Sequence, residues 1–330
     1  MTHRPTENDR ELMDALARRH GGVFSVVEAD QVGLDDWGRR ALVRSGLLLR
    51  LRRGWHATEA ALTAGSAPDP LELEVPEPIR RAEALHRLMV RSYQVEYARR
   101  AVVTGHSALL MMGLPAHGAR LGQVSLARTR PGRTRAAKTL LLGPHDPGAT
   151  VSKAGVVDAA TAVVEHGLRV GLRSALASSD QALRAGSTDV AALREAIARA
   201  RNRTGVPALH ALPSLVDPVA ESVGESLLRF DLMMAGFAVE SQVRLTTRSG
   251  ARRVDFVIKG TRVIVEFDGL KKFAGPRSSS AVPATFARDA ELIELGYQVV
   301  HVFWNELGDI KLLQRRVMSA HRASARAVGA

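Results

Sequence analysis

Residues 252–273 read RRVDFVIKGTRVIVEFDGLKKF, and this stretch decides how the C-terminal part of the chain folds. Two apolar, β-branched runs flank a Lys-Gly-Thr turn, which predicts an antiparallel pair of strands. Three acids, Asp255, Glu266 and Asp268, interrupt these runs. Burying a carboxylate is costly unless a cation or hydrogen-bond donors stabilise it, so we expect compensating groups nearby.

The position of the turn sets the register of the two strands. A two-residue loop at 260–261 places Asp255 directly opposite Glu266, whereas a loop at 259–260 makes them diagonal neighbours. In both registers the two carboxylates share a face, because side chains alternate between the faces of a sheet. Asp268 lies two positions beyond Glu266 and points the same way.

Carboxylates gathered at a strand end are ligands for Mg²⁺ or Mn²⁺ rather than for zinc. Such a cation polarises a phosphoryl oxygen and activates a water, and the ammonium of Lys272 or Lys271 could stabilise the charge that develops on the phosphate. In the other interpretation, Asp255, Glu266 and Asp268 occupy an edge strand facing water, and the lysines are surface partners. The metal interpretation predicts phosphodiester hydrolysis.

The composition predicts a cytoplasmic protein of two or three domains. The chain has 330 residues, 45% of them hydrophobic, and no cysteine, which excludes disulfides, thiolate zinc sites and cysteine nucleophiles. No apolar run approaches the roughly 20 residues of a membrane span, and the N-terminus lacks the apolar core of a signal peptide. The net charge is +12, and residues 78–140 hold twelve Lys or Arg against two acids, a local excess of +10. A surface with that excess would attract phosphate backbones, and in the other interpretation it is a solvated face.

The N-terminal part has the order of a winged helix-turn-helix, in which the third helix enters the major groove. A helix starts at Thr6, a short one covers 25–32, and a third covers 34–46 before an alternating basic strand at 47–58. Protein-binding modules share this outline, and Trp37 could instead belong to the core. The expected DNA contacts are Trp37, Arg39, Arg40 and Arg44 on the groove helix and Arg50, Arg52 and Arg53 on the wing.

A Pro-rich, acidic linker and a mixed α/β middle region follow. In the middle region, residues 121–143 resemble a basic hairpin whose arginines match phosphate geometry: Arg128, Arg130, Arg133 and Arg135, with Lys138 beside them. RNA is a less favoured partner, because aromatic residues make up 4% of the chain and no stacking platform is visible.

The C-terminal part reads as an α/β unit. It has a helix from 221, strands at 240–245, 252–258 and 262–268, a helix at 286–295, a strand at 297–304 and a last helix. The predicted fold is therefore multidomain α/β. Its parts are a winged helix-turn-helix (1–63), a linker (64–78), a basic middle domain (79–215) and an α/β domain (216–330), which the resemblance described next implies to be restriction-endonuclease-like.

Several of these motifs together carry a resemblance. V-D-F, V-E-F-D-G, K-K-F, the pair Arg288-Asp289 and GYQVVHVFW resemble the Vsr-like endonuclease domain of the PD-(D/E)XK superfamily. GGVFSVVEADQVGL and TGHSALLMMGLP are similar to the AbiEi-type antitoxin module and its companion region. Actinobacterial proteins that pair these two parts resemble most of this chain.

The resemblance implies roles for particular residues. Asp255 and Glu266 would be the metal-binding acids, and Asp268 stands where many members of the superfamily have a lysine. Lys272 would be the electrostatic catalyst, in preference to Lys271. Glu225 matches an acid that can complete such sites.

Some of these residues have structural interpretations as well. Ser222 and Glu225 also have the spacing of a helix capping box. His301 could donate a proton or be structural, and Trp304 is expected in the core. The relatives tend to carry basic residues at the positions of Phe286 and Ile293, and at that of His301, which weakens the expected phosphate clamp.

Two functions follow as hypotheses. The first is a Mg²⁺- or Mn²⁺-dependent DNA endonuclease with the catalytic set Asp255, Glu266, Asp268, Lys272 and Glu225. The second is an antitoxin-type DNA-binding regulator, with a toxin protein as a further partner, whose nuclease fold does not turn over. Carboxylates paired with arginine would favour the second.

Overall fold

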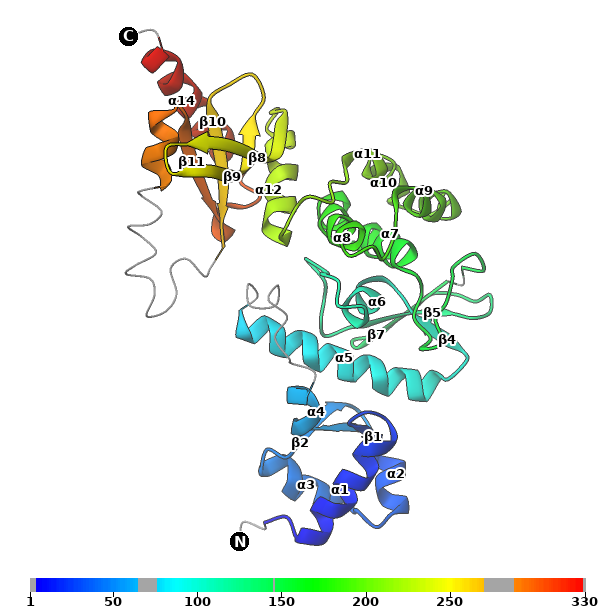
Figure 1. The fold of residues 1–330 in the computed structure, drawn as a ribbon. Coiled ribbons are helices and arrows are strands. Elements are labelled where there is room, and N and C mark those ends of the chain that lie inside the picture. The colour runs from blue at the N-terminus through cyan, green and yellow to red at the C-terminus, as the bar shows by residue number, and fades with distance from the viewer. Residues whose placement is uncertain (1–3, 65–75, 145, 270–287, 329–330) are drawn as a thin grey trace. The chain divides into compact units, whose positions relative to one another are not determined.

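The computed structural model describes residues 4–64, 76–144, 146–269 and 288–328 (Figure 1). The chain is a mixed α/β protein, as expected, and the described residues form three small sheets. It divides into two compact units, Met1–Arg169 with Glu195–Arg203, and Val170–Arg194 with Thr204–Ala330. None of the described helices is both long enough and apolar enough to cross a membrane.

The N-terminal elements alternate helices with short strands that form a sheet of order β1-β3-β2. Thr6 caps the first helix as predicted, in a capping box with Asp9. The strand expected over 47–58 is two antiparallel strands joined by a turn at Gly54, whose φ of 76° suits glycine. The elements are α1 (Glu7–Arg19), β1 (Val23–Ser25), α2 (Val26–Gln31), α3 (Asp36–Arg44), β2 (Leu48–Arg52), β3 (Trp55–Thr58) and α4 (Glu59–Ala64).

Two apolar clusters hold these elements. One gathers Leu16, Phe24 and Leu42 between the three helices. The other joins Trp55 of the sheet to Leu88 of the long helix α5 (Glu77–Tyr97). The N-terminal elements and α5 therefore share a core, although residues 65–75 of the predicted linker lie outside the described part of the chain.

The rest of the first unit has a second sheet, of order β4-β5-β7-β6. The basic hairpin predicted over 121–143 is wrong: β5 runs parallel to β7, and the short β6 pairs antiparallel with β7. A parallel pair needs a crossover, and β6 with its flanking loops provides it. The elements are β4 (Ala101–Val103), α6 (Gly105–Met111), β5 (Val124–Arg128), β6 (Arg135–Ala136), β7 (Leu140–Gly143) and α7 (Ala159–Val170).

The TGHSALLMMGLP segment forms a buried polar cluster. Nδ1 of His86 lies 2.7 Å from the Leu121 carbonyl, which can only accept, so Nε2 accepts from the Ser107 hydroxyl at 2.9 Å. Burial lowers the pKa of His86 to about 4. Because both side chains are fully buried, the serine and histidine support the fold and are not a nucleophile pair open to substrate.

The second unit contains a four-stranded sheet of order β11-β10-β9-β8, in which β8, β9 and β10 are antiparallel and β11 is parallel to β10. A helical segment at 288–294 lies between β10 and β11 in sequence. The elements are α8 (Leu172–Arg184), α9 (Val190–Arg199, whose residues fall in both units), α10 (Val206–Leu209), α11 (Leu212–Leu215), α12 (Val223–Met234), β8 (Val239–Thr247), β9 (Gly250–Ile258), β10 (Val263–Asp268), β11 (Gln298–Phe303), the 3₁₀ turn η3 (Trp304–Glu306) and α14 (Ile310–Val328).

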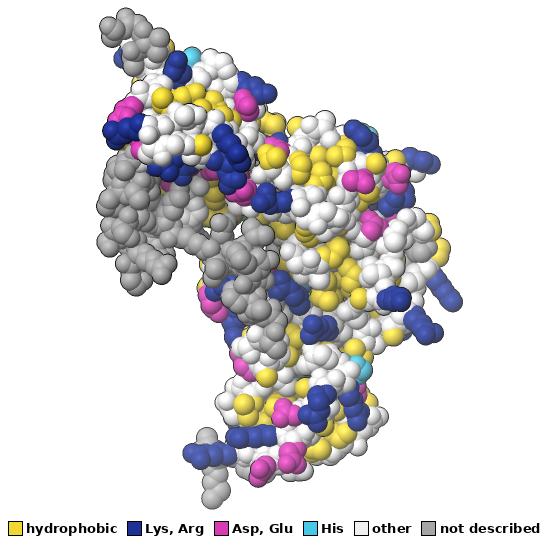
Figure 2. All heavy atoms as spheres, in the orientation of Figure 1, with side chains coloured by type: hydrophobic (Ala, Val, Ile, Leu, Met, Phe, Trp, Pro, Cys, Tyr) yellow, Lys and Arg dark blue, Asp and Glu magenta, His cyan; other side chains and the backbone are white. Residues whose placement is uncertain are grey.

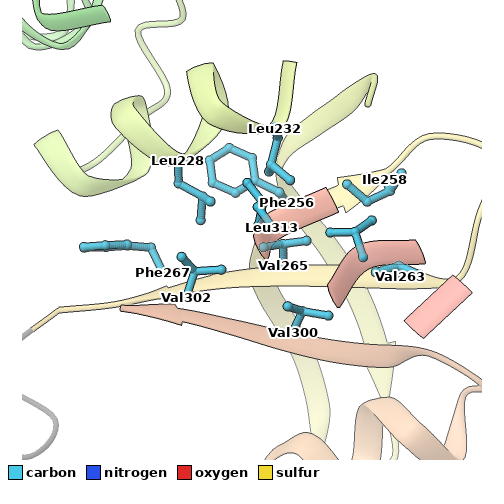
Figure 3. Packing of buried hydrophobic residues seen from close by; sticks show 11 residues of the cluster. Leu228, Leu232, Phe256, Ile258, Val263, Val265, Phe267, Val300, Val302 and Leu313 are labelled. Atoms are coloured by element: carbon cyan, nitrogen blue, oxygen red, sulfur yellow. The ribbon is translucent and has the colours of Figure 1, made fainter. Parts of the chain in front are cut away.

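Both faces of this sheet are covered. On one face, Leu228 and Leu232 of α12 and Leu313 of α14 point toward Phe256 and Val265 (Figure 3). On the other face, Leu292 of the 288–294 segment packs on Ile264. Every residue of β10 is consequently buried, including its two acids. Trp304 packs edge-on against Phe267 with ring centroids 5.2 Å apart, as expected of a core residue.

The register agrees with one of the two alternatives left open by the sequence. Ile264 pairs with Val257 and Val265 with Phe256, which is the register of a loop at 260–261. The paired residues end there, one position before Asp255 and Glu266, so the shared face of these two carboxylates stays a prediction. Glu266 alternates with Val265 and so lies on the face of Ile264, which the 288–294 segment covers.

Gly224 provides a test of the packing between α12 and the sheet. A Cβ at this position would lie 2.0 Å from Cε1 of Phe267. We expect Gly224→Ala to lower the free energy of unfolding by about 1–3 kcal/mol, even though alanine normally gains up to ~1 kcal/mol over glycine inside a helix. Urea denaturation followed by circular dichroism measures the change.

Gly122→Ala is the matched control, because a Cβ there meets nothing within 4 Å. Its stability should stay within about 0.5 kcal/mol of the original chain. Equal stabilities for the Gly224 and Gly122 variants would contradict this account of the packing.

Candidate functional site

The candidate site lies where β9 and β10 separate. Their ladder reaches Val265 and Phe256. Beyond that pair, the backbone N–H of Phe267 donates to Oδ2 of Asp255 at 2.8 Å, so a side-chain carboxylate replaces the carbonyl of the neighbouring strand. The backbone donor is satisfied, and the carboxylate is held in the gap between the strands.

Arg288 binds both sides of this gap. Its Nη2 donates to Oε1 of Glu266 at 3.0 Å and to the backbone carbonyl of Arg253 at 2.7 Å. Glu266 is only 4% exposed, and a buried carboxylate needs a positive charge or several donors. The guanidinium at the start of the 288–294 segment supplies that charge.

Asp268 belongs to a separate set of contacts. Nδ1 of His301 on β11 lies 2.8 Å from Oδ2 of Asp268, and Nε2 of the same ring lies 2.9 Å from Oδ2 of Asp289. Asp268 and then Asp289 raise the pKa of His301, against the effect of partial burial. This histidine, predicted as a proton donor or a structural residue, joins two aspartates across β10, β11 and the 288–294 segment.

Glu225 faces the gap from the first turn of α12. Ser222 caps the helix, accepting from the Glu225 N–H at 3.1 Å, which confirms the first half of the predicted capping box. The other half is not formed, because the backbone N–H that donates to the Glu225 carboxylate is that of Glu221. The Glu225 carboxylate also accepts from the Glu221 N–H at 2.9 Å and from Nε2 of Gln242 at 2.8 Å. Burial and then the charge of Asp255 raise the pKa of Glu225 to about 7.

The three acids predicted as one metal site are thus distributed over different partners. Asp255 accepts from a backbone N–H, Glu266 from Arg288, and Asp268 lies against His301. Among residues 4–64, 76–144, 146–269 and 288–328, no group of three or more His, Asp or Glu is placed to hold a metal ion. The contacts present therefore do not fit a three-carboxylate metal centre. Lys271, Lys272 and Phe286 lie outside the described residues.

Two further residues of this site follow from the structure and were given no role by the sequence. Arg288 was noted only as part of a motif, and Gln242 was not singled out. Gln242 has a φ of 54°, a left-handed conformation uncommon outside glycine, and its amide reaches Glu225. The sequence signal that pointed to Arg288 was its place in the charged pair Arg288-Asp289.

In α3, the predicted groove helix, only some of the residues expected to contact DNA are exposed to solvent. Trp37 is 54% exposed, so its core interpretation is wrong, and Arg44 is also exposed. The side chain of Arg40 is 70% exposed and pairs with Asp36 at 2.8 Å. Arg39 is a correction: it is 6% exposed and donates to Asp30 and to the Leu34 carbonyl, both at 2.5 Å. It anchors α3 from inside.

The predicted wing divides in the same way. Arg50 and Arg53 are exposed. Arg52 is a correction, because it donates to Ser92 at 2.8 Å, pairs with Glu96 at 2.6 Å and lies over the ring of Tyr93. These partners are on α5, so Arg52 fastens β2 to α5.

The arginines predicted in the basic middle segment lie mostly at the surface. Arg130, Arg133 and Arg135 are exposed, and Lys138 beside them is exposed too. Arg128 is half-buried and donates from Nε to the Arg133 carbonyl at 3.2 Å. Figure 2 shows Lys and Arg side chains scattered over the viewed faces of both units.

Two adjoining cavities of about 120 and 220 Å³ lie in the first unit. Their charged lining includes two ion pairs, Arg203 with Glu165 and Arg199 with Asp146 at 3.5 Å. Arg128 also lines the first of them.

Comparison with known protein families finds no matching family model, and comparison with curated proteins finds no match. The resemblance to the endonuclease and antitoxin families therefore stays a resemblance.

The raised pKa of Glu225 gives a pH-dependent test of the site. The folded chain holds this proton more tightly than the unfolded chain, so stability falls as pH rises from 4.5 toward 7. Glu225→Gln keeps the shape of the protonated side chain. We expect the variant to exceed the original chain in stability by on the order of 1–3 kcal/mol at pH 8 and much less at pH 5. Urea denaturation at both pH values measures this, and a pH-independent difference would contradict it.

Proposed function

We propose that this chain is a DNA-binding protein and that its N-terminal elements read the duplex. The order α1-β1-α2-α3-β2-β3 is that of a winged helix-turn-helix, whose third helix enters the major groove. The resemblance to AbiEi-type antitoxin modules supports the same interpretation.

The observation that carries the proposal is the exposed face of α3. Trp37, Arg40 and Arg44 follow one another at intervals of three and four residues, which places them along one face of the helix. Arg39, fixed to Asp30, holds the opposite side of the helix in the core. The outer face of α3 carries two exposed guanidinium groups and an indole, which suit base edges and phosphates, and Arg40 is held there by its pair with Asp36 at 2.8 Å.

Other exposed arginines supply contacts to the backbone of the duplex. Arg50 and Arg53 lie on the wing, and the segment around Arg130, Arg133 and Arg135 carries no acid. Such residues bind phosphates without regard to sequence and make affinity depend strongly on salt.

Replacing the outward-facing arginines of α3 should weaken binding to a preferred duplex. We expect Arg40→Ala/Arg44→Ala to lose about 10- to 100-fold in affinity for a site selected from a random library, because each base or phosphate contact contributes on the order of a kcal/mol. Fluorescence anisotropy measures it. Arg10→Ala/Arg18→Ala on α1 removes the same charge from exposed positions and should bind nearly as the original chain does. Equal losses of affinity in both variants would show that α3 is not the helix that contacts the duplex.

For the second unit we propose a nuclease-like domain that binds without cutting. In sequence, its sheet lies between α12 and α14. Strands β8, β9 and β10 form an antiparallel meander and β11 adds a parallel fourth strand, a topology like that of restriction endonucleases. Arg288 supplies to Glu266 the positive charge that a divalent cation would supply in an active enzyme. This pairing favours the antitoxin-type regulator over the enzyme.

A metal-dependent DNA endonuclease remains the second candidate, and Glu225 favours it. Two carboxylates close enough for Asp255 to raise the pKa of Glu225 repel each other, and a bound cation would relieve that repulsion. When bound, Mg²⁺ or Mn²⁺ would polarise a phosphate oxygen and acidify a water. In this candidate Asp255 and Glu266 hold the ion, which requires Arg288 to leave Glu266.

A plasmid cleavage assay with Mg²⁺, Mn²⁺ or chelator separates the two candidates. We expect the original chain and its Asp255→Ala and Glu266→Ala variants to show the same low background, because Arg288 neutralises Glu266. Metal-dependent nicking that both variants lose would establish the endonuclease.

The proposal that Arg288 takes the place of a cation at Glu266 also predicts how Mg²⁺ affects stability, which can be measured without a cleavage assay. We expect 10 mM Mg²⁺ to raise the melting temperature of Arg288→Gln and to leave that of the original chain unchanged, since binding to the folded state alone stabilises it. An equal shift in both proteins would show that Arg288 does not take the place of a cation.

A further inference from the structure

The last helix, α14, carries a line of positive charge that neither the winged helix nor the nuclease-like site uses. From Ile310 to Val328 the sequence contains no acid. Four cations of this helix are exposed: Lys311, Arg315, Arg322 and Arg326, here called the basic stripe.

Helix geometry puts all four on one line. Their spacings are four, seven and four residues, which at 3.6 residues per turn keeps them within a sector of roughly 60°. At 1.5 Å per residue the stripe is about 22 Å long. Leu313 and Val317, on the opposite side of α14, are buried against the sheet, so the stripe faces away from it.

The stripe works against the stability of the helix. Lys311 and Arg315, like Arg322 and Arg326, are like charges four residues apart, which destabilises a helix by a few tenths of a kcal/mol per pair. Lys311 also lies in the first turn, where the helix dipole disfavours a cation. None of the four forms an ion pair with any residue that the structure describes. Arg316, by contrast, pairs with Glu306 at 2.7 Å.

We propose that the basic stripe of α14 binds the phosphate backbone of duplex DNA. The proposal rests on the DNA binding proposed above and adds a contact surface in the second unit. A duplex carries one phosphate about every 3.4 Å of its axis on each strand, so a line about 22 Å long meets enough phosphates for all four cations. The contacts are independent of base sequence, because the stripe presents charge and no base-reading geometry.

A membrane surface is the less favoured partner for this helix. Amphipathic helices that bind bilayers bury an apolar face among the lipids. The apolar face of α14 is already buried against the protein, and Met318 is the one large apolar side chain exposed on this helix among the side chains that the structure describes.

The test uses the full chain and a duplex of fixed length and unselected sequence. Binding is measured by fluorescence anisotropy over a series of KCl concentrations, giving the slope of log K against log [KCl]. Arg315→Gln/Arg322→Gln should reduce the magnitude of that slope by about 1–2, since each lost phosphate contact removes roughly 0.9. Arg194→Gln/Lys259→Gln is the matched control: it removes two exposed charges from the same unit. Its slope should equal that of the original chain.

The outcomes separate this proposal from the one on which it rests. An unchanged slope in the stripe variant, with normal DNA binding by the original chain, overturns the stripe alone. An equal reduction of the slope in the stripe and control variants also overturns the stripe, because it reflects overall charge. Binding to vesicles that contain phosphatidylserine is measured in parallel, and a stripe variant that loses only vesicle binding overturns the stripe as a DNA contact. Failure of the original chain to bind DNA overturns both proposals.

Discussion

The second unit depends on one constraint: β10 is buried on both faces and yet carries two carboxylates. Alternation sends Glu266 and Asp268 toward the face covered by the 288–294 segment, so that face must present cations. Arg288 and His301 meet this demand from two different elements. The charged contacts therefore fasten the 288–294 segment to the sheet together with the apolar contact of Leu292.

The sequence predicted much of this local arrangement. The apolar alternation located β9 and β10 within about three residues of their ends, and one of the two turn positions weighed from the sequence has the register in which Val265 pairs with Phe256. The caps at Thr6 and Ser222 were readable because each depends on residues three positions apart.

Contacts between distant residues were not readable. Arg52 is buried because Ser92, forty positions away, accepts its hydrogen bond. The parallel pairing of β5 with β7 depends on a crossover that periodicity does not show. The pairing of Arg288 with Glu266 joins elements twenty-two positions apart. Because the sequence does not show which distant residues pair, it predicted a metal site at Glu266, where the structure has an ion pair with Arg288.

The arginines of this chain have two uses. Arg39, Arg52 and Arg229 are largely buried and fix one element to another; the Nη2 of Arg229 on α12, for instance, lies 3.0 Å from Asp180 on α8. Their charge is neutralised inside the protein and contributes little to its outer field. The formal charge of +12 is therefore a poor guide to where a polyanion would bind, and exposure residue by residue is a better one.

The edge strand β8 has a consequence for solubility. A nine-residue strand at the margin of a sheet offers unpaired backbone groups to any other extended chain, and long, flat margins of this kind promote aggregation. The left-handed residue Gln242 interrupts the regular strand conformation near the middle of β8, and the charged Glu240 and Arg244 are exposed on either side of it. The residue that orients Glu225 thereby also discourages intermolecular sheet extension.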